Sequence, residues 1–185
     1  METAAAGSAF GHYYLDARLE YVPGVTLDVL LRRGPLQTSE IVRFGAQLAR
    51  GLAAAHGAGA VHGDIRPGKL KVTPDGLLKI LDFGVSPNTA GGSRVDPRLD
   101  IFSAGAVLYE MTCGRPPFTD THPQRLIEAI LNGKVPLPSQ VDPGVHPSLE
   151  RIIIRALEPL PARRFANAAD LAEALESLAE PRIRQ

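Results

Sequence analysis

The amino-acid sequence predicts a mainly α-helical fold with short β-hairpins along one edge. Long stretches of the chain place apolar residues three and four positions apart, which is the spacing of amphipathic helices. Two short apolar runs, at 70–72 and 77–81, flank a Pro-Asp-Gly sequence that is typical of a tight turn between strands. The chain has 185 residues, of which 44% are hydrophobic and 22% charged, as expected for one globular domain.

The first part of the chain should form one strand and two helices. Apolar and polar residues alternate over 13–22, which predicts a strand. A short helix is expected over 26–33, because a Gly-Pro pair stops it. A longer amphipathic helix should follow, capped by Thr38 or Ser39 and ending near His56-Gly57.

The middle of the chain should hold short strands, a loop and one buried helix. Strands are expected over 60–61, 70–72 and 77–81, and the segment 85–97, which is rich in Gly, Pro and Ser, should be a loop. Residues 101–111 are apolar nearly all round, which predicts a helix that is buried on every side.

Three amphipathic helices are expected in the last third of the chain. Their apolar faces carry Leu126, Ile127, Ile130 and Leu131 in the first, Leu149, Ile152, Ile153 and Leu157 in the second, and Leu171, Leu175 and Leu178 in the third. Asn167 is the expected N-cap of the third helix. Because no linker divides the chain, one domain is predicted over residues 13–180, between flexible tails at 1–12 and 181–185.

Charge and composition exclude several kinds of function. The 20 basic residues are balanced by 20 acidic ones, so a nucleic acid is not the expected partner. No segment approaches the ~18 consecutive apolar residues of a membrane-spanning helix, and the first residues do not resemble a signal peptide. Cys113 is the only cysteine, which fits a reducing compartment. These features predict a cytoplasmic protein with no membrane contact.

Two motifs indicate the chemistry. His62-Gly63-Asp64-Ile65-Arg66-Pro67 lies on a predicted loop, and Asp82-Phe83-Gly84 directly follows a predicted strand. Either motif alone means little, because short sequences of this kind arise by chance in many proteins. Together, on the two sides of a predicted hairpin, they resemble the catalytic loop and the metal-binding loop of protein kinases.

Further segments extend this resemblance in the order that the family has them. They resemble the hinge between the kinase lobes, the start of the buried central helix, the loop after that helix and the segment before the last helix. In turn these are Glu20–Gly24, Asp100–Gly105, Gly114–Phe118 and Pro161–Phe165. The resemblance implies the helical C-terminal lobe of a bacterial-type serine/threonine kinase, truncated and degenerate. The small N-terminal lobe is expected to be absent, since no Gly-rich loop or Val-Ala-Ile-Lys strand precedes Tyr13.

The resemblance also implies catalytic and nucleotide-binding roles. Phosphoryl transfer needs a base, a cation on the phosphates and metal ions held by oxygen ligands. In the family pattern, Asp64 would be the catalytic base, Arg66 would contact a phosphate and Asp82 would bind the metal ion. Glu20 and Val22 would offer backbone groups to the adenine edge.

Three other residues would be structural by the same resemblance. His62 would be a packed core residue, and Asp100 would hold the catalytic loop by accepting backbone hydrogen bonds from the segment near His62 to Asp64. Arg164 takes the position of an arginine that pairs with a glutamate of the activation segment. No Ala-Pro-Glu sequence lies between Asp82 and Asp100, so Arg164 is expected to lack that partner.

Two lysines depart from the family pattern. Lys69 stands where the family has an asparagine that binds the second metal ion, and an ammonium cannot coordinate Mg²⁺. Two unit charges ~4 Å apart interact by ~4 kcal/mol at an effective dielectric of 20, so Lys69 should repel a metal ion. Lys71 stands where the family has an apolar residue under the adenine ring. Both side chains are expected to be solvated at an open rim, and a metal-free contact of Lys69 with a phosphate is the alternative.

Three hypotheses of function follow. The first is a catalytically impaired, pseudokinase-like domain that needs no cofactor and binds another protein, with self-association through an uncovered apolar edge around Leu15–Tyr21 as one form. The second is an active serine/threonine kinase that uses Mg-ATP, with its N-terminal lobe supplied by another chain or an upstream reading frame. The third is a decayed gene fragment, against which the regular apolar faces of the last four helices argue.

Overall fold

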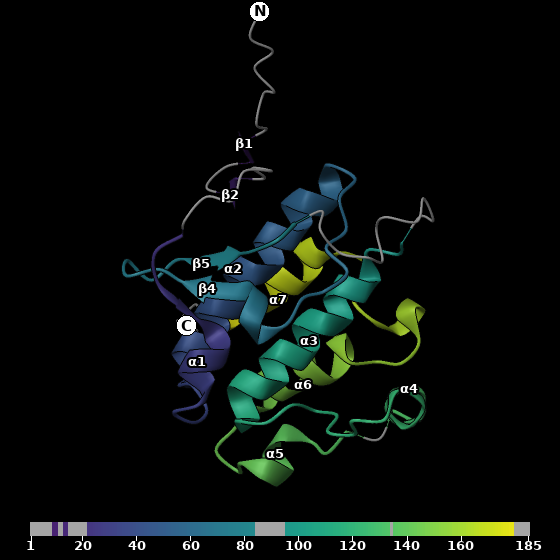
Figure 1. Cartoon of the computed structure of the whole chain (residues 1–185). Helices are drawn as coiled ribbons and strands as arrows, with labels where there is room; N and C mark the ends of the chain where they lie inside the picture. The colour runs from purple at the N-terminus through teal and green to yellow at the C-terminus, as the bar shows by residue number, and fades with distance from the viewer. Residues whose placement is uncertain (1–8, 11–12, 15–21, 84–94, 134, 180–185) are drawn as a thin grey trace, which may run out of the picture.

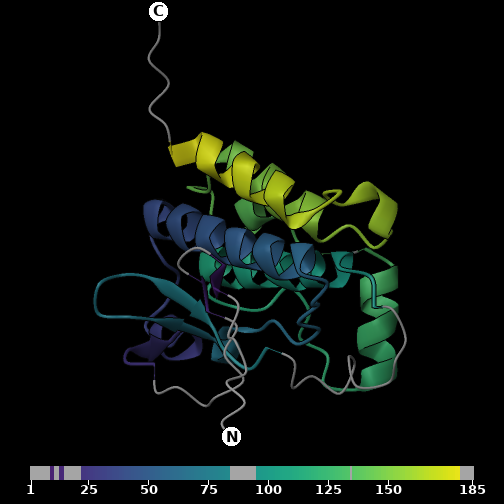
Figure 2. The ribbon, with the colours of Figure 1, turned by 90° about the horizontal axis from the view of Figure 1, so that it is seen from above.

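Two long helices, α2 and α3, lie at the centre of this computed structural model, which describes residues 9–10, 13–14, 22–83, 95–133 and 135–179. The α-helices are α1 (Leu27–Leu31), α2 (Thr38–Gly57), α3 (Arg98–Cys113), α4 (Pro123–Leu131), α5 (Pro138–Val141), α6 (Pro147–Ala156) and α7 (Ala168–Ala179). Helix α2 packs against both α7 and α3, and α3 packs against α6 (Figure 1, Figure 2). The predicted helical fold is confirmed.

The central helix α3 is buried nearly all round, as its apolar sequence predicts. Ile101, Val107, Leu108 and Met111 are each at most 1% exposed. Gly105 lets α3 approach α6 closely, because a Cβ atom at this position would lie 2.8 Å from the Cβ of Ala156.

A small antiparallel sheet lies at one edge of the helices. Its strand order is β3 (Val25–Thr26), β4 (Leu70–Val72) and β5 (Leu78–Ile80), and the 3-10 turn η1 (Pro67–Lys69) leads into β4. Residues 74–76 form the predicted turn between β4 and β5. Strand β2 (Tyr13–Tyr14) falls at the start of the predicted strand 13–22, of which residues 15–21 lie outside the described part. It pairs with β1 (Ala9–Phe10), which lies in the segment 1–12 that the sequence predicted as a flexible tail.

Several local predictions are wrong. Residues 60–61 form no strand, because the Ala60 N–H donates to the carbonyl of Ala55 at the end of α2. The N-cap of α2 is Gln37, whose backbone N–H donates to the Glu40 carboxylate at 3.2 Å, and not Thr38 or Ser39. Strand β3 and helix α5 were not predicted.

The last three predicted helices are present as α4, α6 and α7, but they differ in burial. The Asn167 Oδ1 atom accepts a hydrogen bond from the Asp170 N–H at 2.9 Å, which confirms Asn167 as the cap of α7. Helix α4 has the predicted apolar face, yet none of its residues is buried, and Ile127 and Leu131 are 56% and 68% exposed. No helix within the described ranges is long and apolar enough to cross a membrane.

Candidate functional site

His62 joins the two loops that carry the motifs. It is 1% exposed, and its Nε2 atom lies 2.8 Å from the Leu81 carbonyl oxygen, to which it donates. Its Nδ1 atom accepts the Asp64 N–H at 3.2 Å, which fits the tautomer with the proton on Nε2. The ring of Phe83 meets the imidazole edge to face at 4.8 Å. Through these contacts the segment before Asp64 is held beside the segment before Asp82.

Asp100, at the start of α3, binds the loop that contains His62 and Gly63. Its carboxylate is 0% exposed and accepts the N–H of His62 on Oδ2 and the N–H of Gly63 on Oδ1, each at 2.8 Å. His56 at the end of α2 donates from Nε2 to Oδ2, also at 2.8 Å. Gly63 has φ +73°, a left-handed conformation that glycine adopts without steric cost. These are the backbone hydrogen bonds that the kinase resemblance predicts for Asp100.

Asp64 and Arg66 lie together at the surface. The Arg66 Nε atom donates to the Asp64 Oδ2 atom at 3.3 Å, and both side chains are open to solvent. An exposed carboxylate can accept a proton from a hydroxyl group, and a neighbouring guanidinium can bind a phosphate anion of the same ligand. The two residues are therefore accessible to a ligand.

Asp82 pairs with Lys69 instead of presenting a free carboxylate. The Lys69 Nζ atom donates to the Asp82 Oδ2 atom, because the β4–β5 hairpin brings the ends of its two strands together. The Lys69 side chain is 22% exposed, so Lys69 is partly solvated, as the sequence predicts, but it is also paired with Asp82. Asp82 also has φ +60°, the only positive φ of a non-glycine residue in the described ranges.

This pair does not fit a divalent metal ion. A metal at Asp82 would need oxygen ligands, and an ammonium already occupies one carboxylate oxygen. Within the described part of the chain, no three His, Cys, Asp or Glu side chains come together in a group that could hold a metal ion. In this structure Asp82 and Lys69 form an ion pair with each other.

A second lysine, Lys71, makes one face of the sheet beside this pair polar. Lys71 on β4 is directly opposite Lys79 on β5, with Thr26 on its other side. Side chains alternate between the faces of a strand, so these three residues share one face, and the buried Leu70 and Leu78 belong to the other. The solvated state expected for Lys71 is not met in full, since Lys71 is partly buried and interacts with neighbouring groups.

Arg164 lies away from the loops and binds backbone carbonyl groups. Its Nε atom donates to the carbonyl of Glu158 at 2.7 Å, and its Nη2 atom to that of Pro159 at 3.0 Å. Its Nη1 atom donates to the Arg98 carbonyl at 2.9 Å, and the guanidinium lies 4.8 Å from the centre of the Phe102 ring. Arg164 thus joins the segment after α6 to the start of α3, in place of the pairing that the family gives it.

The pKa values of Arg164 and of the nearby Asp96 both differ from their ordinary values. Burial lowers the pKa of the Arg164 guanidinium from its ordinary value, an effect that Asp96 opposes. A hydrogen bond from Arg98 lowers the pKa of the Asp96 carboxyl, and the two side chains form an ion pair at 2.8 Å. Arg98 therefore has a definite partner.

Comparison with known proteins agrees with this geometry. Residues 9–96 match the family described as the protein kinase domain. Over 184 residues, 33% are identical to a probable serine/threonine-protein kinase of Clostridium acetobutylicum, an alignment that covers 86% of this chain and 28% of that protein. The chain belongs to the protein kinase-like superfamily.

Two other relatives are also bacterial serine/threonine-protein kinases. This chain is 36% identical to serine/threonine-protein kinases drp72 of Corynebacterium efficiens, covering 91% of the chain and 36% of that protein. It is 32% identical to serine/threonine-protein kinase PknL of Mycobacterium tuberculosis, covering 88% and 46% respectively. The chain thus spans between about a quarter and a half of the length of the curated relatives it matches, and it is part of a serine/threonine protein kinase-like domain.

The structure brings some of the predicted site residues together. Asp64, Arg66, Lys69 and Asp82 lie at one end of the β4–β5 hairpin, and His62 beneath them links the two loops. Val22 is described but lies outside every helix and strand, and Glu20 lies outside the described residues, as do Leu15–Tyr21.

Two features of this kinase-like site were missed by sequence reasoning. His56 was predicted only as a residue at the end of a helix, although it is the third donor to Asp100. The Lys69–Asp82 pair joins two residues that were considered only separately, each in relation to a metal ion. The predicted hairpin between the two motifs could have indicated this pair, because antiparallel strands place the residue before the first strand, Lys69, near the residues after the second, where Asp82 lies.

Proposed function

We propose that this serine/threonine kinase-like domain is catalytically impaired and acts by binding another protein. The observation that carries the proposal is the ion pair between Lys69 and Asp82. The catalytic metal ion of phosphoryl transfer is held by carboxylate and amide oxygens and neutralises charge that develops on the phosphates. Here the carboxylate is neutralised by an ammonium, so a metal ion must displace Lys69 before it can bind.

A second observation, at Lys71, supports an impaired site beside the Lys69–Asp82 pair. The Lys71 ammonium stands at the position that the family pattern assigns to the apolar floor of the adenine pocket. An adenine ring gains little by packing on an ammonium group, and the further desolvation of a charged group costs free energy. Both changes weaken nucleotide binding, one at the phosphates and one at the base.

The buried framework around these residues supports a folded domain with a retained role. Asp100, His56 and His62 form a connected hydrogen-bond network. A network whose buried members are all satisfied specifies one arrangement of the core, which is what a binding surface requires. This intact interior argues against the decayed fragment.

Phosphoryl transfer is the second candidate, and one observation favours it. Asp64 and Arg66 are accessible and adjacent, in the arrangement that a base and a phosphate-binding cation require. An active kinase would bind ATP together with Mg²⁺. A separate possibility is that Lys69 itself binds a phosphate, in which case the site would hold a nucleotide without a metal ion. The two candidates therefore differ in how binding depends on Mg²⁺.

A thermal-shift titration with ATP, with and without Mg²⁺, separates these candidates. A ligand at 100 times its Kd stabilises a fold by ~2.7 kcal/mol, which is a readily measured shift. We expect no shift that depends on Mg²⁺ in the unaltered chain. A shift that requires Mg²⁺ and is lost in Asp82→Ala would overturn the proposal in favour of the enzyme.

Lysine variants complete the experiment. A shift seen only without Mg²⁺, lost in Lys69→Ala and kept in Lys79→Ala, would support the metal-free mode. Lys79→Ala removes the same charge from the next strand and is the matched control. A radiolabelled phosphoryl-transfer assay of the same variants should show no incorporation above that of Asp64→Asn.

A further inference from the structure

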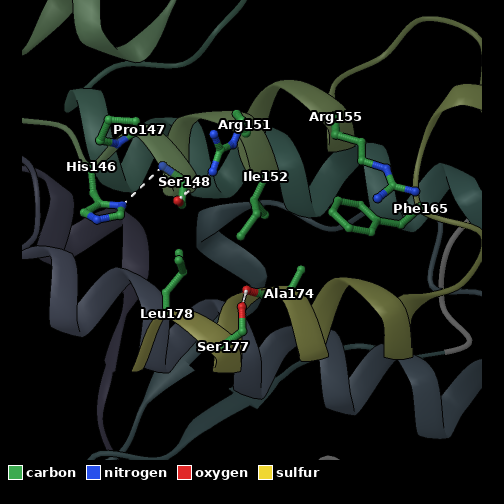
Figure 3. Close-up of a pocket in the computed structure, with 10 residues that line it drawn as sticks. All are labelled: His146, Pro147, Ser148, Arg151, Ile152, Arg155, Phe165, Ala174, Ser177 and Leu178. Atoms are coloured by element: carbon green, nitrogen blue, oxygen red, sulfur yellow. Dashed lines mark hydrogen bonds between the residues drawn. The ribbon is translucent and has the colours of Figure 1, made fainter. Parts of the chain in front are cut away.

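A hollow between α6 and α7 lies apart from the loops that carry the kinase motifs. It has a volume of about 1080 Å³, which is large enough for several side chains of a bound segment. Neither Asp64 nor Asp82 lines it. Figure 3 shows Ile152 from α6 and Leu178 from α7 pointing into the gap between the two helices. Phe165, from the segment between α6 and α7, is a third apolar side chain of its lining.

Two arginines border this hollow, whose lining also includes the polar side chains of Ser148 and Ser177. Arg151 and Arg155 are one turn apart on α6, and both are exposed. The Arg151 Nη2 atom donates to the Ser148 Oγ atom at 2.9 Å, and the Arg155 guanidinium lies 4.3 Å from the centre of the Phe165 ring. These contacts orient both guanidinium groups at the edge of the hollow (Figure 3).

Neither arginine has a carboxylate partner in the described part of the chain. Arg50 on α2 differs in this respect, because its Nε atom donates to the Glu176 carboxylate of α7 at 2.8 Å. The charge of Arg50 is thus balanced by a carboxylate of the same chain, whereas no carboxylate in the described ranges forms an ion pair with Arg151 or Arg155. Their free donors are therefore available to an acidic ligand.

The same two arginines line a second, smaller hollow on the other side of α6. Its volume is about 320 Å³, and Arg163 adds a third guanidinium to its lining. Glu150 and Glu158 are the acidic residues there, and the Glu150 carboxylate accepts the Ser139 N–H at 2.7 Å. The arginines thus form a basic ridge between two hollows, which extends the surface that one ligand could cover.

We infer that the α6–α7 hollow docks an acidic, amphipathic segment of a partner protein. Apolar side chains of the segment would fill the gap beside Ile152 and Leu178, and its carboxylates would bind Arg151 and Arg155. This inference rests on the proposed function and names the surface and the partner chemistry that it needs. An amphipathic helix in an apolar groove is a recurring mode of peptide recognition, and the arginines add orientation.

Charge excludes the end of this chain as the occupant. Residues 180–185 contain two arginines and one glutamate, so their net charge has the same sign as that of the ridge. Residues 1–8 contain a single acidic residue and no long apolar side chain beyond Met1. Neither segment offers the repeated carboxylates that Arg151 and Arg155 would need.

Fluorescence anisotropy tests the docking surface directly. The probe is a fluorescein-labelled helical peptide of about 14 residues with Leu at positions i, i+3, i+4 and i+7 and Glu at the flanking positions. The full chain should bind it, and Arg151→Glu/Arg155→Glu should weaken binding at least about tenfold. The matched control, Arg33→Glu/Arg125→Glu, makes the same charge change at exposed positions outside the hollow and should bind as the unaltered chain does.

Several outcomes would overturn the inference. These are no binding at millimolar peptide, equal weakening by the two double variants, or equal binding of a peptide with Lys in place of Glu. Light scattering that shows a dimer lost only in Arg151→Glu/Arg155→Glu would make a second copy the occupant and also overturn it. Chemical-shift changes at the Ala174 and Ser177 amides provide an independent readout that does not depend on a folded variant.

The proposed function fails separately from this inference. Lys69→Ala lies outside the hollow and should leave peptide binding unchanged. If the peptide does not bind and ATP with Mg²⁺ also gives no shift, the docking surface is wrong while the impaired site remains. If both bind, the impaired site is wrong and the docking surface remains.

Discussion

Asp100 and Asp82 are two aspartates of one kinase-like framework with opposite surroundings. The carboxylate of Asp100 is fully buried and accepts three hydrogen bonds, two of them from backbone N–H groups. The carboxylate of Asp82 is 40% exposed and pairs with the ammonium of Lys69. The family pattern is thus followed where it positions the catalytic loop and altered where it would hold a metal ion.

This difference separates the shape of the site from its chemistry. A buried carboxylate cannot be changed without leaving several donors unpaired, whereas an exposed one can exchange its partner at little cost. The comparison predicts large effects of substitutions around Asp100 and small ones around Asp82.

Asp100→Ala should have the largest effect on stability. It leaves the N–H groups of His62 and Gly63 without an acceptor inside the protein, so the free energy of unfolding should fall by about 1–3 kcal/mol. Urea denaturation followed by circular dichroism measures this change. Asp100→Asn keeps one acceptor oxygen, so its free energy of unfolding should lie between those of the unaltered chain and Asp100→Ala. A midpoint of Asp100→Ala equal to that of the unaltered chain would contradict the role of this carboxylate.

His56→Ala should have an intermediate effect. It removes one donor to the Asp100 carboxylate and keeps both backbone donors, so we expect a loss of about 1–2 kcal/mol. His56→Gln can restore a donor to Asp100 and should recover part of this loss. A full loss in His56→Gln would mean that the imidazole acts by packing and not by its hydrogen bond.

Lys69→Met should have a small effect on stability. The Lys69–Asp82 pair is partly exposed, and such pairs contribute less than about 1 kcal/mol. The methionine keeps most of the side-chain volume and removes the charge. A loss as large as that of Asp100→Ala, measured by the same denaturation, would remove the contrast between the two aspartates.

The Asp96–Arg98 pair should give the smallest effect, visible only in acid. A hydrogen bond from Arg98 lowers the pKa of Asp96 below its ordinary value of 3.8, so the pair stabilises the fold above that value and its contribution is lost as the pH falls. Stability measured between about pH 3 and pH 6 should therefore decline less steeply in Asp96→Asn. An identical slope in both proteins would show that the pair contributes nothing.

The sequence predicted the fold and the frame of the site but not its partnerships. The sequence predicted α2, α3, α6 and α7, because the buried apolar face of a helix requires apolar residues every three to four positions. The resemblance placed Asp100 beneath the catalytic loop. The donor from His56 could not be predicted, because it depends on where the end of α2 falls relative to the start of α3.

The Lys69–Asp82 pair and the α6–α7 hollow were missed for a related reason. A salt bridge requires a particular side-chain conformation at both ends, which residue identity alone does not fix. The hollow depends on the spacing of two helices whose apolar faces were both assigned to the core. Likewise, the pattern of α4 predicted amphipathicity correctly but not that its apolar face would stay exposed.

Paramagnetic broadening by Mn²⁺ tests the central claim most directly, because Mn²⁺ takes the same oxygen ligands as Mg²⁺. The measurement follows amide signals of Asp82 and Phe83 during titration, with exposed Asp170 on α7 as an internal control. The Lys69–Asp82 pair predicts that the signals near Asp82 broaden no more than those near Asp170, and that Lys69→Asn makes the broadening near Asp82 selective. Selective broadening at Asp82 in the unaltered chain would show that this carboxylate binds a metal ion and would contradict the account.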